Sequence, residues 1–211
     1  MTAWFSVISA RFRRRRMLRF VRTLGIGPAT RVLDVGGTRG YWELLPDPPR
    51  VTLLNMARAR EALPEGSWVA GDGRALPFRD GAFDVVFSNS VIEHVGDHRS
   101  QARFAREAMR VGRNFWVQTP NRWFPVEQHL LMPLVHWLPR RWQRVLAPRL
   151  DLARIVHRLS PDRREFYVRH YLEDVRLLDA AGLRALFPGA RLVRERFCGF
   201  TKSLIVYAER E

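Results

Sequence analysis

The sequence has little cysteine and lysine, and no acidic residue near its start. The single cysteine, Cys198, excludes an internal disulfide and any zinc site built from several cysteines, and it fits a reducing cytoplasm. Lys202 is the only lysine among 36 basic residues, so arginine supplies nearly all of the positive charge behind the formal net charge of +15. A genome-wide coding bias towards arginine would give the same composition as selection for binding to a polyanion. The net charge alone therefore does not predict nucleic-acid binding.

The positive charge is unevenly distributed along the chain. Residues 1–24 contain seven arginines and no acid, whereas residues 25–120 contain twelve basic and eleven acidic residues. Residues 121–150 contain five basic residues and one acidic residue, and residues 151–211 contain twelve and nine. The segment 25–120 is thus nearly neutral. The length of 211 residues suits one α/β domain with an insertion.

The first 24 residues predict a basic amphipathic helix. Their apolar residues recur at helical spacing, and the polar side is almost entirely arginine. Charges interrupt the segment too often for a transmembrane helix, and the basic residues follow the apolar run instead of preceding it as in a signal peptide. Two interpretations stay open: a helix packed on the domain, or one that rests on an anionic membrane surface. We expect a cytoplasmic protein, with the inner membrane surface as the place for any peripheral contact.

A glycine-rich turn at residues 31–41 dominates the first half of the chain. A strand-forming segment that contains Asp34 runs into Gly36, Gly37 and Gly40, as expected where a buried strand turns sharply into a helix. Backbone N–H groups at such a turn, with the positive end of a helix behind them, suit an anionic or polar ligand. The carboxylate of Asp34 suits hydroxyls or a cation. A zwitterionic amino-acid moiety would satisfy both requirements.

Strands and helices alternate after this turn, which predicts a parallel sheet covered by helices on both faces. The expected strands are residues 32–35, 51–54, 67–70, 83–90, 114–118, 191–196 and 204–208, and the expected helices after the turn are residues 41–45, 100–111 and 172–186. Ligands of such sheets bind at the carboxyl ends of the strands. The polar motifs of this chain fall at those ends.

Residues 121–170 break this rhythm and predict an inserted helical cap. The cap combines apolar and aromatic residues with arginines: Leu130, Leu131, Leu134, Val135, Trp137, Leu138, Trp142 and Val145, beside Arg140, Arg141 and Arg144. One interpretation is a lid with an apolar underside. The other is an interfacial belt, because Trp and Arg are enriched where proteins meet a membrane surface.

Four motifs together resemble those of the class I S-adenosylmethionine-dependent methyltransferases of the small type 11 kind. They are V-L-D-V-G-G-T-R-G, G-D-G-R-A-L-P-F, F-D-V-V-F-S-N-S-V-I-E-H-V and R-E-A-M-R-V, in the order and spacing of that family. The resemblance implies an α/β fold with a doubly wound, Rossmann-like, mostly parallel sheet and a C-terminal antiparallel hairpin. The expected division is a basic helix (1–24), a cofactor-binding core (25–120), the cap (121–170) and the completion of the sheet (171–211).

The resemblance also implies positions for the cofactor S-adenosylmethionine. They are Asp34, Gly36 and Gly40 around the methionine part, Asn55 at the ribose, Asp72 and Gly73 at the adenine, and Asn89 below the sulfonium, with Gly37 and Met56 as further cofactor-binding positions. Two residues depart from the family pattern. Thr38 stands where the middle glycine of the loop is usual, and Asn55 replaces the usual acid. Each departure fits either a weaker cofactor affinity or a protein that has lost turnover.

Methyl transfer requires a proton acceptor only when the methylated group is a hydroxyl or a protonated amine. Four candidate bases follow the fourth and fifth expected strands: Glu93, His94, Glu127 and His129. We expect His129 to be the main catalytic residue, with Glu93 and His94 beside it, because a proline-fixed cap segment can aim it at the site. In the competing interpretation, His94 packs under the sheet and bonds backbone, while Glu127 and His129 cap the following helix.

Glu93 and His94 also match part of an acid-x-x-Glu-His element that resembles a metal site of quinone-ring O-methyltransferases. Ser90 replaces the first carboxylate of that element. Such a site has too few ligands unless Glu127 or His129 completes it. We therefore expect no metal ion.

The leading functional hypothesis is methyl transfer to a small-molecule or lipid-linked acceptor, on oxygen in preference to carbon or nitrogen. An apolar acceptor would suit both interpretations of the cap. An RNA methyltransferase is the first alternative, supported by the arginine cluster at residues 11–16, although no RNA-binding module is recognisable and nucleic acid is not the expected partner. The second alternative is a catalytically silent, cofactor-binding partner subunit.

Overall fold

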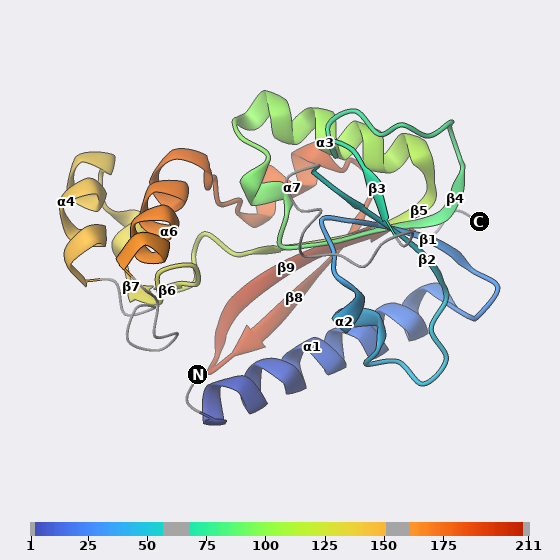
Figure 1. Cartoon of the computed structure of the whole chain (residues 1–211), viewed down its shortest axis with the longest axis horizontal. Helices are drawn as coiled ribbons and strands as arrows, with labels where there is room; N and C mark the ends of the chain where they lie inside the picture. The colour runs from blue at the N-terminus through green and yellow to red at the C-terminus, as the bar shows by residue number, and fades with distance from the viewer. Residues whose placement is uncertain (1–2, 57–67, 151–160, 209–211) are drawn as a thin grey trace.

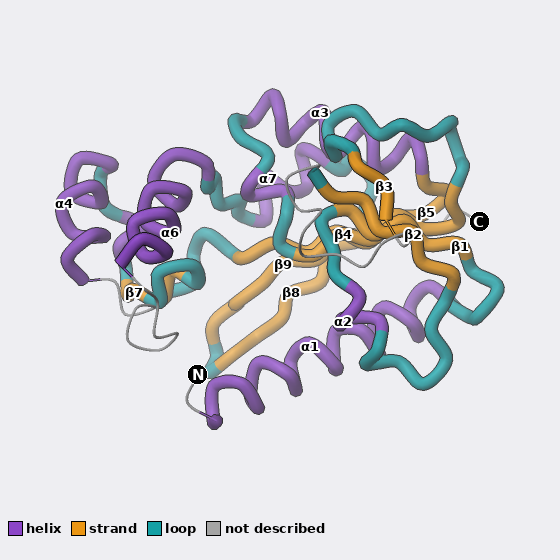
Figure 2. The backbone as a smooth tube through the Cα atoms, viewed as in Figure 1, coloured by secondary structure: helices purple, strands orange, loops and turns teal. Residues whose placement is uncertain are grey.

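The computed structural model describes residues 3–56, 68–150 and 161–208. They form a twisted seven-stranded sheet with helices on both faces, and a smaller helical unit stands to one side (Figure 1). The backbone trace shows this smaller unit beyond the ends of the strands, joined to the sheet by loops (Figure 2). No helix among the described residues is both long and apolar enough to cross a membrane.

The strand order in the sheet is β3-β2-β1-β4-β5-β9-β8. The strands are β1 (Arg31–Val35), β2 (Arg50–Asn55), β3 (Trp68–Ala70), β4 (Phe83–Asn89), β5 (Gly112–Pro120), β8 (Arg191–Phe197) and β9 (Phe200–Ala208). The first five pair in parallel, whereas β9 is antiparallel to both β5 and β8. This arrangement confirms the predicted fold class. The chain reverses its direction of winding between β1 and β4, where sheets of this kind bind ligands.

Helices cover both faces of the sheet because neighbouring residues of its strands point to opposite sides. On one face, Val86 belongs to the apolar cluster under α3 (His98–Val111) and α7 (Ala180–Leu186). On the other face, Val85 belongs to the cluster under α1 (Ala3–Leu24) and α2 (Arg39–Trp42). Central strands buried on both faces read as continuous apolar runs, as observed for β4.

Helix α1 is built into this second cluster. Met17 and Phe20 are completely buried. The ring of Phe20 makes edge contacts with the rings of Trp42, Phe87 and Trp116, at centroid separations of 6.0, 4.9 and 5.6 Å. The structure therefore agrees with the first interpretation of this segment, a helix packed on the domain.

The cap contains two short strands, β6 (Val126–Glu127) and β7 (Met132–Pro133), the 3₁₀ turn η3 (Val135–Trp137), and the helices α4 (Arg140–Leu150) and α6 (Pro161–Asp174). It has an apolar cluster of its own, formed by Leu130, Met132, Val135, Ala147, Val168, Tyr171 and Val175. The boundary expected at residue 170 falls inside α6. Residues 151–160 of the expected cap, and Ser67 of the expected third strand, lie outside the described residues.

Several predicted elements were wrong in their limits, among them the helix expected at 41–45, which is α2 at Arg39–Trp42. The single helix expected at 172–186 is divided, because α6 ends at Asp174 and the side chain of Asp179 caps the new helix α7 by accepting from the Gly182 N–H. Apolar spacing continues across this break, so periodicity did not reveal it. Between the strands expected at 191–196 and 204–208, the chain makes a tight turn at Cys198 and Gly199, both with positive φ, and β9 already begins at Phe200.

Candidate active site

The carboxyl ends of β1, β2 and β3 border a cavity of about 220 Å³. Five of the nine residues expected around the cofactor line it: Gly36, Asn55, Met56, Asp72 and Gly73. Thr38 and Arg39 do not line this cavity. The glycine turn thus faces the same space as the ends of the next two strands, and its bulkier residues do not block that space.

The glycines of the turn are required by their surroundings. Gly36 has a φ of +78°, and a Cβ there would lie 2.5 Å from a methyl carbon of Val91. A Cβ on Gly37 would lie only 1.7 Å from the carboxylate of Asp34. Thr38, in contrast, has an extended backbone that any residue adopts (φ −131°, ψ 155°). The departure at Thr38 is therefore compatible with an intact turn.

Asp34 lies under this turn and is 1% exposed. Its Oδ2 accepts a hydrogen bond of 2.8 Å from Trp42 Nε1, whereas its buried Oδ1 has no partner. Burial raises the pKa of Asp34 to about 7, although the bond from Trp42 acts in the opposite direction. A buried acceptor without a partner is costly, and a donor group on a ligand would satisfy it. This observation fits the amino group of S-adenosylmethionine.

Asn55 and Asp72 occupy the ends of the neighbouring strands. Asn55 Nδ2 donates a hydrogen bond of 3.0 Å to the carbonyl of Gly37, which ties β2 to the glycine turn. A carboxylate could not make this bond, so the replacement of the usual acid has a structural reason here.

Asp72 accepts a bond of 2.6 Å from Arg74, which also lines the cavity and holds the pKa of Asp72 below its usual value. Arg74 was not among the residues expected at the site. Its position two residues after Asp72 was the available signal.

The other four expected cofactor residues, Asp34, Gly37, Gly40 and Asn89, are not among the residues that line the cavity. Asn89 accepts a hydrogen bond from Arg16 of α1 and donates one to the Tyr41 hydroxyl. The Arg16 guanidinium is nearly buried and also contacts Gln118 and Glu195, at 3.1 and 2.6 Å. An arginine from the basic run therefore links the ends of β4 and β5 to β8, which composition alone did not reveal.

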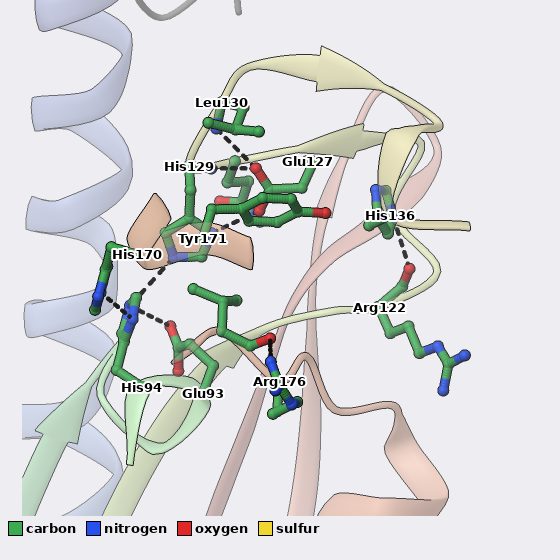
Figure 3. A network of polar contacts seen from close by, with 12 residues as sticks. Glu93, His94, Arg122, Glu127, His129, Leu130, His136, His170, Tyr171 and Arg176 are labelled. Carbon is green, nitrogen blue, oxygen red and sulfur yellow. Dashed lines mark hydrogen bonds and ion pairs between the residues drawn. The ribbon is translucent and has the colours of Figure 1, made fainter. Parts of the chain in front are cut away.

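All three expected catalytic residues lie together on the cap side of the cavity. His94, which lines the cavity, contacts His129 through the two Nε2 atoms at 3.2 Å. Glu93 Oε1 lies 3.9 Å from His94 Nε2. Figure 3 shows His94 between His129 of the cap and a third ring, that of His170. His170 Nε2 lies 3.1 Å from His94 Nδ1, and the sequence analysis did not anticipate it.

The contacts of Glu127 and His94 bear on the competing interpretation of these side chains. Glu127 does cap its turn, because its Oε2 accepts from the backbone N–H groups of His129 and Leu130. Its Oε1 contacts His129 Nδ1, so the same carboxylate also orients the imidazole. The competing interpretation had His94 bonding backbone under the sheet, whereas its ring contacts two other imidazoles.

The surroundings give these titratable groups different properties. Burial raises the pKa of Glu93 to about 7, against the attraction of His129 and the hydrogen bond from Thr119. Burial and the neighbouring His129 and His170 lower the pKa of His94 to about 3. Burial also lowers the pKa of His129, but the hydrogen bond and charge of Glu127 outweigh it, so this pKa lies above its usual value. The surroundings therefore disfavour the protonated form of His94 and favour that of His129.

Comparison with known proteins shows what the core of this chain is similar to. Residues 29–114 match the family model described as a methyltransferase domain. An uncharacterized methyltransferase of Mycolicibacterium gilvum (strain PYR-GCK) is 36% identical over 102 residues, which are 41% of this chain and 38% of that protein. The chloroplastic 2-methyl-6-phytyl-1,4-hydroquinone methyltransferase 2 of Oryza sativa subsp. japonica is 36% identical over 93 residues, 39% of this chain and 27% of that protein.

A solved structure shares the fold at low sequence identity. Magnesium protoporphyrin IX methyltransferase from Synechocystis PCC 6803, crystallised with bound SAH, superposes with a TM-score of 0.54 and 16% identity, over 97% of this chain and 84% of that one. The chain spans only 38% and 27% of the length of the two curated relatives above. Residues 29–114 therefore form a methyltransferase domain, and the fold resembles that of a methyltransferase crystallised with bound SAH.

Proposed function

We propose that this protein transfers the methyl group of S-adenosylmethionine to a hydroxyl oxygen of a small-molecule or lipid-linked acceptor. One observation supports the proposal most directly. His94 lines the cavity at the strand ends and also contacts His129 of the cap. The donor cavity and the group that would receive a proton are therefore neighbours. The acceptor would lie between the core and the cap.

The residues of the core would hold the cofactor. The unpartnered oxygen of Asp34 and the bare backbone at Gly36 and Gly37 suit the methionine part, while Asn55 and Met56 suit the ribose and Asp72 with Gly73 the adenine. We assign this role to residues 25–120, the cap role to residues 121–170, and the completion of the sheet to residues 171–211. The bound cofactor supplies a methyl group on a sulfonium, which is an excellent leaving group. The protein mainly has to align the acceptor and exclude water.

Oxygen is the preferred acceptor atom because the site holds a base. The contact with Glu127 fixes His129 and raises its pKa, and Nε2 of the ring faces the His94 side of the cluster. His129 would remove the hydroxyl proton, with Glu93 and neutral His94 beside it. A well-placed base of this kind contributes roughly 100-fold or more to a rate.

An apolar acceptor is supported by the surface of the cap. Six large apolar side chains are exposed in the part of the cap that the structure describes: Trp123, Leu134, Trp137, Leu138, Trp142 and Val145. Trp side chains beside arginines suit the headgroup region of a membrane, and the exposed arginines of α1 suit an anionic surface. The rice relative is named for a hydroquinone with a phytyl chain, although its match covers only 39% of this chain. We therefore place the protein in the cytoplasm, with peripheral contact at the inner membrane surface.

RNA methylation is a second candidate, favoured by one groove. A cavity of about 740 Å³ between α1 and β8 is lined by Arg15, Arg19, Arg22, Arg194 and Arg196, among other residues. Such a lining suits phosphates. RNA binding whose affinity falls steeply with salt would favour this candidate over a lipid acceptor.

The proposed function can be tested with labelled S-adenosylmethionine and a panel of quinols and hydroxylated lipids in detergent. The expected result is cofactor binding by calorimetry and label in an extractable ether product. Asp34→Asn keeps an acceptor for Trp42 but removes the carboxylate charge, so we expect a cofactor affinity about 10-fold lower, or about 1.4 kcal/mol. His129→Gln should reduce transfer about 100-fold with cofactor affinity retained, because the base is lost.

The matched control is His136→Gln, since His136 is a cap histidine that contacts the Arg122 carbonyl and none of the cluster residues. It should leave both measurements unchanged. Failure of the wild-type protein to bind S-adenosylmethionine would remove the basis of the proposal.

A further inference from the structure

Three side chains beside the cavity converge on one point. Glu93, His94 and His129 each place one potential ligand atom here, and these three atoms lie within 4.8 Å of one another. The two imidazoles approach through Nε2 atoms at 3.2 Å, and Glu93 Oε1 lies 3.9 Å from His94 Nε2. Ligand bonds of about 2.0–2.1 Å in a tetrahedral zinc site place neighbouring ligand atoms about 3.3 Å apart. The separation of the two nitrogens already has this value.

The unsatisfied atoms of this cluster face the same point. Glu93 is completely buried, and its Oε1 has no hydrogen-bond partner. A buried carboxylate oxygen without a partner is costly, and a cation would satisfy it. The facing Nε2 atoms share a single proton when they hydrogen-bond. A metal ion would instead use the lone pairs of both.

The opposite side of each of these groups is held by another residue. His129 Nδ1 contacts Glu127, and Glu93 Oε2 accepts from Thr119 at 2.9 Å. His94 Nδ1 contacts His170 Nε2, and His170 Nδ1 contacts Asp174 at 2.7 Å. A metal-binding histidine usually donates its other ring N–H to a carboxylate or to another hydrogen-bond acceptor. That contact keeps the proton on Nδ1 and leaves the Nε2 lone pair for the ion. The outer contacts therefore match this use of all three residues.

From this geometry we propose that Glu93, His94 and His129 bind one divalent metal ion, with zinc as the preferred ion. Two imidazoles and one carboxylate form a ligand set typical of catalytic zinc, which keeps a fourth position open. Thiolates take no part, because the only cysteine is exposed in the β8–β9 turn. The proposal differs from the sequence-based expectation of no metal. The element after β4 had too few ligands there, and His129 of the cap supplies the missing one.

Because its ligands come from both parts of the protein, the ion would link the core to the cap. Glu93 and His94 lie in the 3₁₀ turn η2 (Ile92–His94), whereas His129 lies between β6 and β7. An acceptor hydroxyl would take the open position, an assignment that rests on the proposed function. A hydroxyl bound to the ion would lose its proton to solvent, since the ion lowers the hydroxyl pKa. The methyl–sulfur bond would then break as the methyl–oxygen bond forms, with the electron pair remaining on sulfur. In the metal-loaded protein, His129 would therefore be a ligand of the ion and not the base. The ion would take over the task of the base, because it lowers the pKa of the hydroxyl.

The test uses zinc alone, without a methyl acceptor. The whole chain is stripped with a chelator, titrated with Zn²⁺ by calorimetry, and analysed for bound zinc, and we expect one ion per chain. His129→Ala and Glu93→Gln should each lower zinc affinity at least about 100-fold, because each removes a ligand. Glu127→Gln should lower it about 10- to 100-fold through the orientation of His129. Near-ultraviolet circular dichroism verifies that each variant remains folded.

His136→Ala is the control and should bind zinc like the wild-type protein. The proposal is overturned if the wild-type chain binds no zinc, or if His129→Ala and His136→Ala bind it equally well. Zinc binding without any methyl transfer would count against the proposed function and leave the metal site supported. Full methyl transfer in excess chelator, by a chain that binds no zinc, would overturn the metal site alone.

Discussion

The helix α1 and the cap have similar compositions and opposite surroundings. Both combine aromatic residues with arginines, and both were open to interpretation as membrane-binding segments. In α1, Phe20 is completely buried and Arg16 is 8% exposed, whereas Trp123 and Trp142 of the cap are 58% and 52% exposed. The difference lies in what each segment covers. An apolar face of the sheet needs α1, but the cap fills its own small core and leaves another apolar surface outside.

Amphipathic composition therefore does not distinguish a structural helix from a binding surface. Helix α1 contributes to the stability of the sheet, and the outer face of the cap does not. Substitutions in the two segments should therefore separate free energy of unfolding from binding.

The largest expected effect concerns the aromatic core under α1. Phe20→Ala should lower the free energy of unfolding by about 3–5 kcal/mol, because it leaves a cavity among Trp42, Phe87 and Trp116. Trp142→Ala, a larger deletion on the cap surface, should change it by less than about 0.5 kcal/mol. Urea unfolding of the two variants measures both values. Similar losses for the two would contradict the contrast between α1 and the cap.

A somewhat smaller effect is expected at the buried ion pair that holds α1 to β8. Glu195→Ala should cost about 3 kcal/mol, because it leaves the Arg16 guanidinium buried without its charge partner. Replacing both residues together, as Arg16→Met with Glu195→Leu, should recover part of this loss, since no charge remains to be desolvated.

The exposed pair Arg169 and Glu173 on α6 supplies the control for this measurement, and breaking it should cost about 1 kcal/mol or less. If Glu195→Ala costs no more than that control in urea unfolding, Arg16 does not anchor the helix.

The smallest effect on stability is expected on the outer face of the cap. Trp123→Ser and Trp142→Ser should each leave the free energy of unfolding within about 0.5 kcal/mol of the wild-type value. Their combination should nevertheless weaken co-sedimentation with vesicles of anionic phospholipid about 10-fold or more, since each ring would lose its apolar contact with the interface. Unchanged vesicle binding, measured beside the folded wild-type chain, would show that the exposed tryptophans serve another purpose.

Several features of the fold and the cofactor region were predictable because they depend on local chemistry. The glycine turn follows from the strand and the glycines that surround Asp34, and its cavity opens toward Asn55 and Asp72 as parallel topology requires. The sequence could not tell whether Thr38 is tolerated in place of the usual glycine. Its backbone is extended, a conformation that does not require glycine. The helix expected at 172–186 was not predicted to divide, because its apolar spacing continues past Asp179. The side chain of Asp179 nevertheless caps a new helix there.

The sequence by itself determined the alternating α/β pattern, the turn at Asp34 and the presence of an insertion, because periodicity and turn chemistry act between near neighbours in the chain. Tertiary structure alone decided that Arg16 is buried at the ends of β4 and β5, and that His94 meets His129 and His170, which are 35 and 76 residues away. These contacts depend on where a helix and a cap dock on the sheet. Docking is set by the fit of whole surfaces, which no short stretch of sequence encodes.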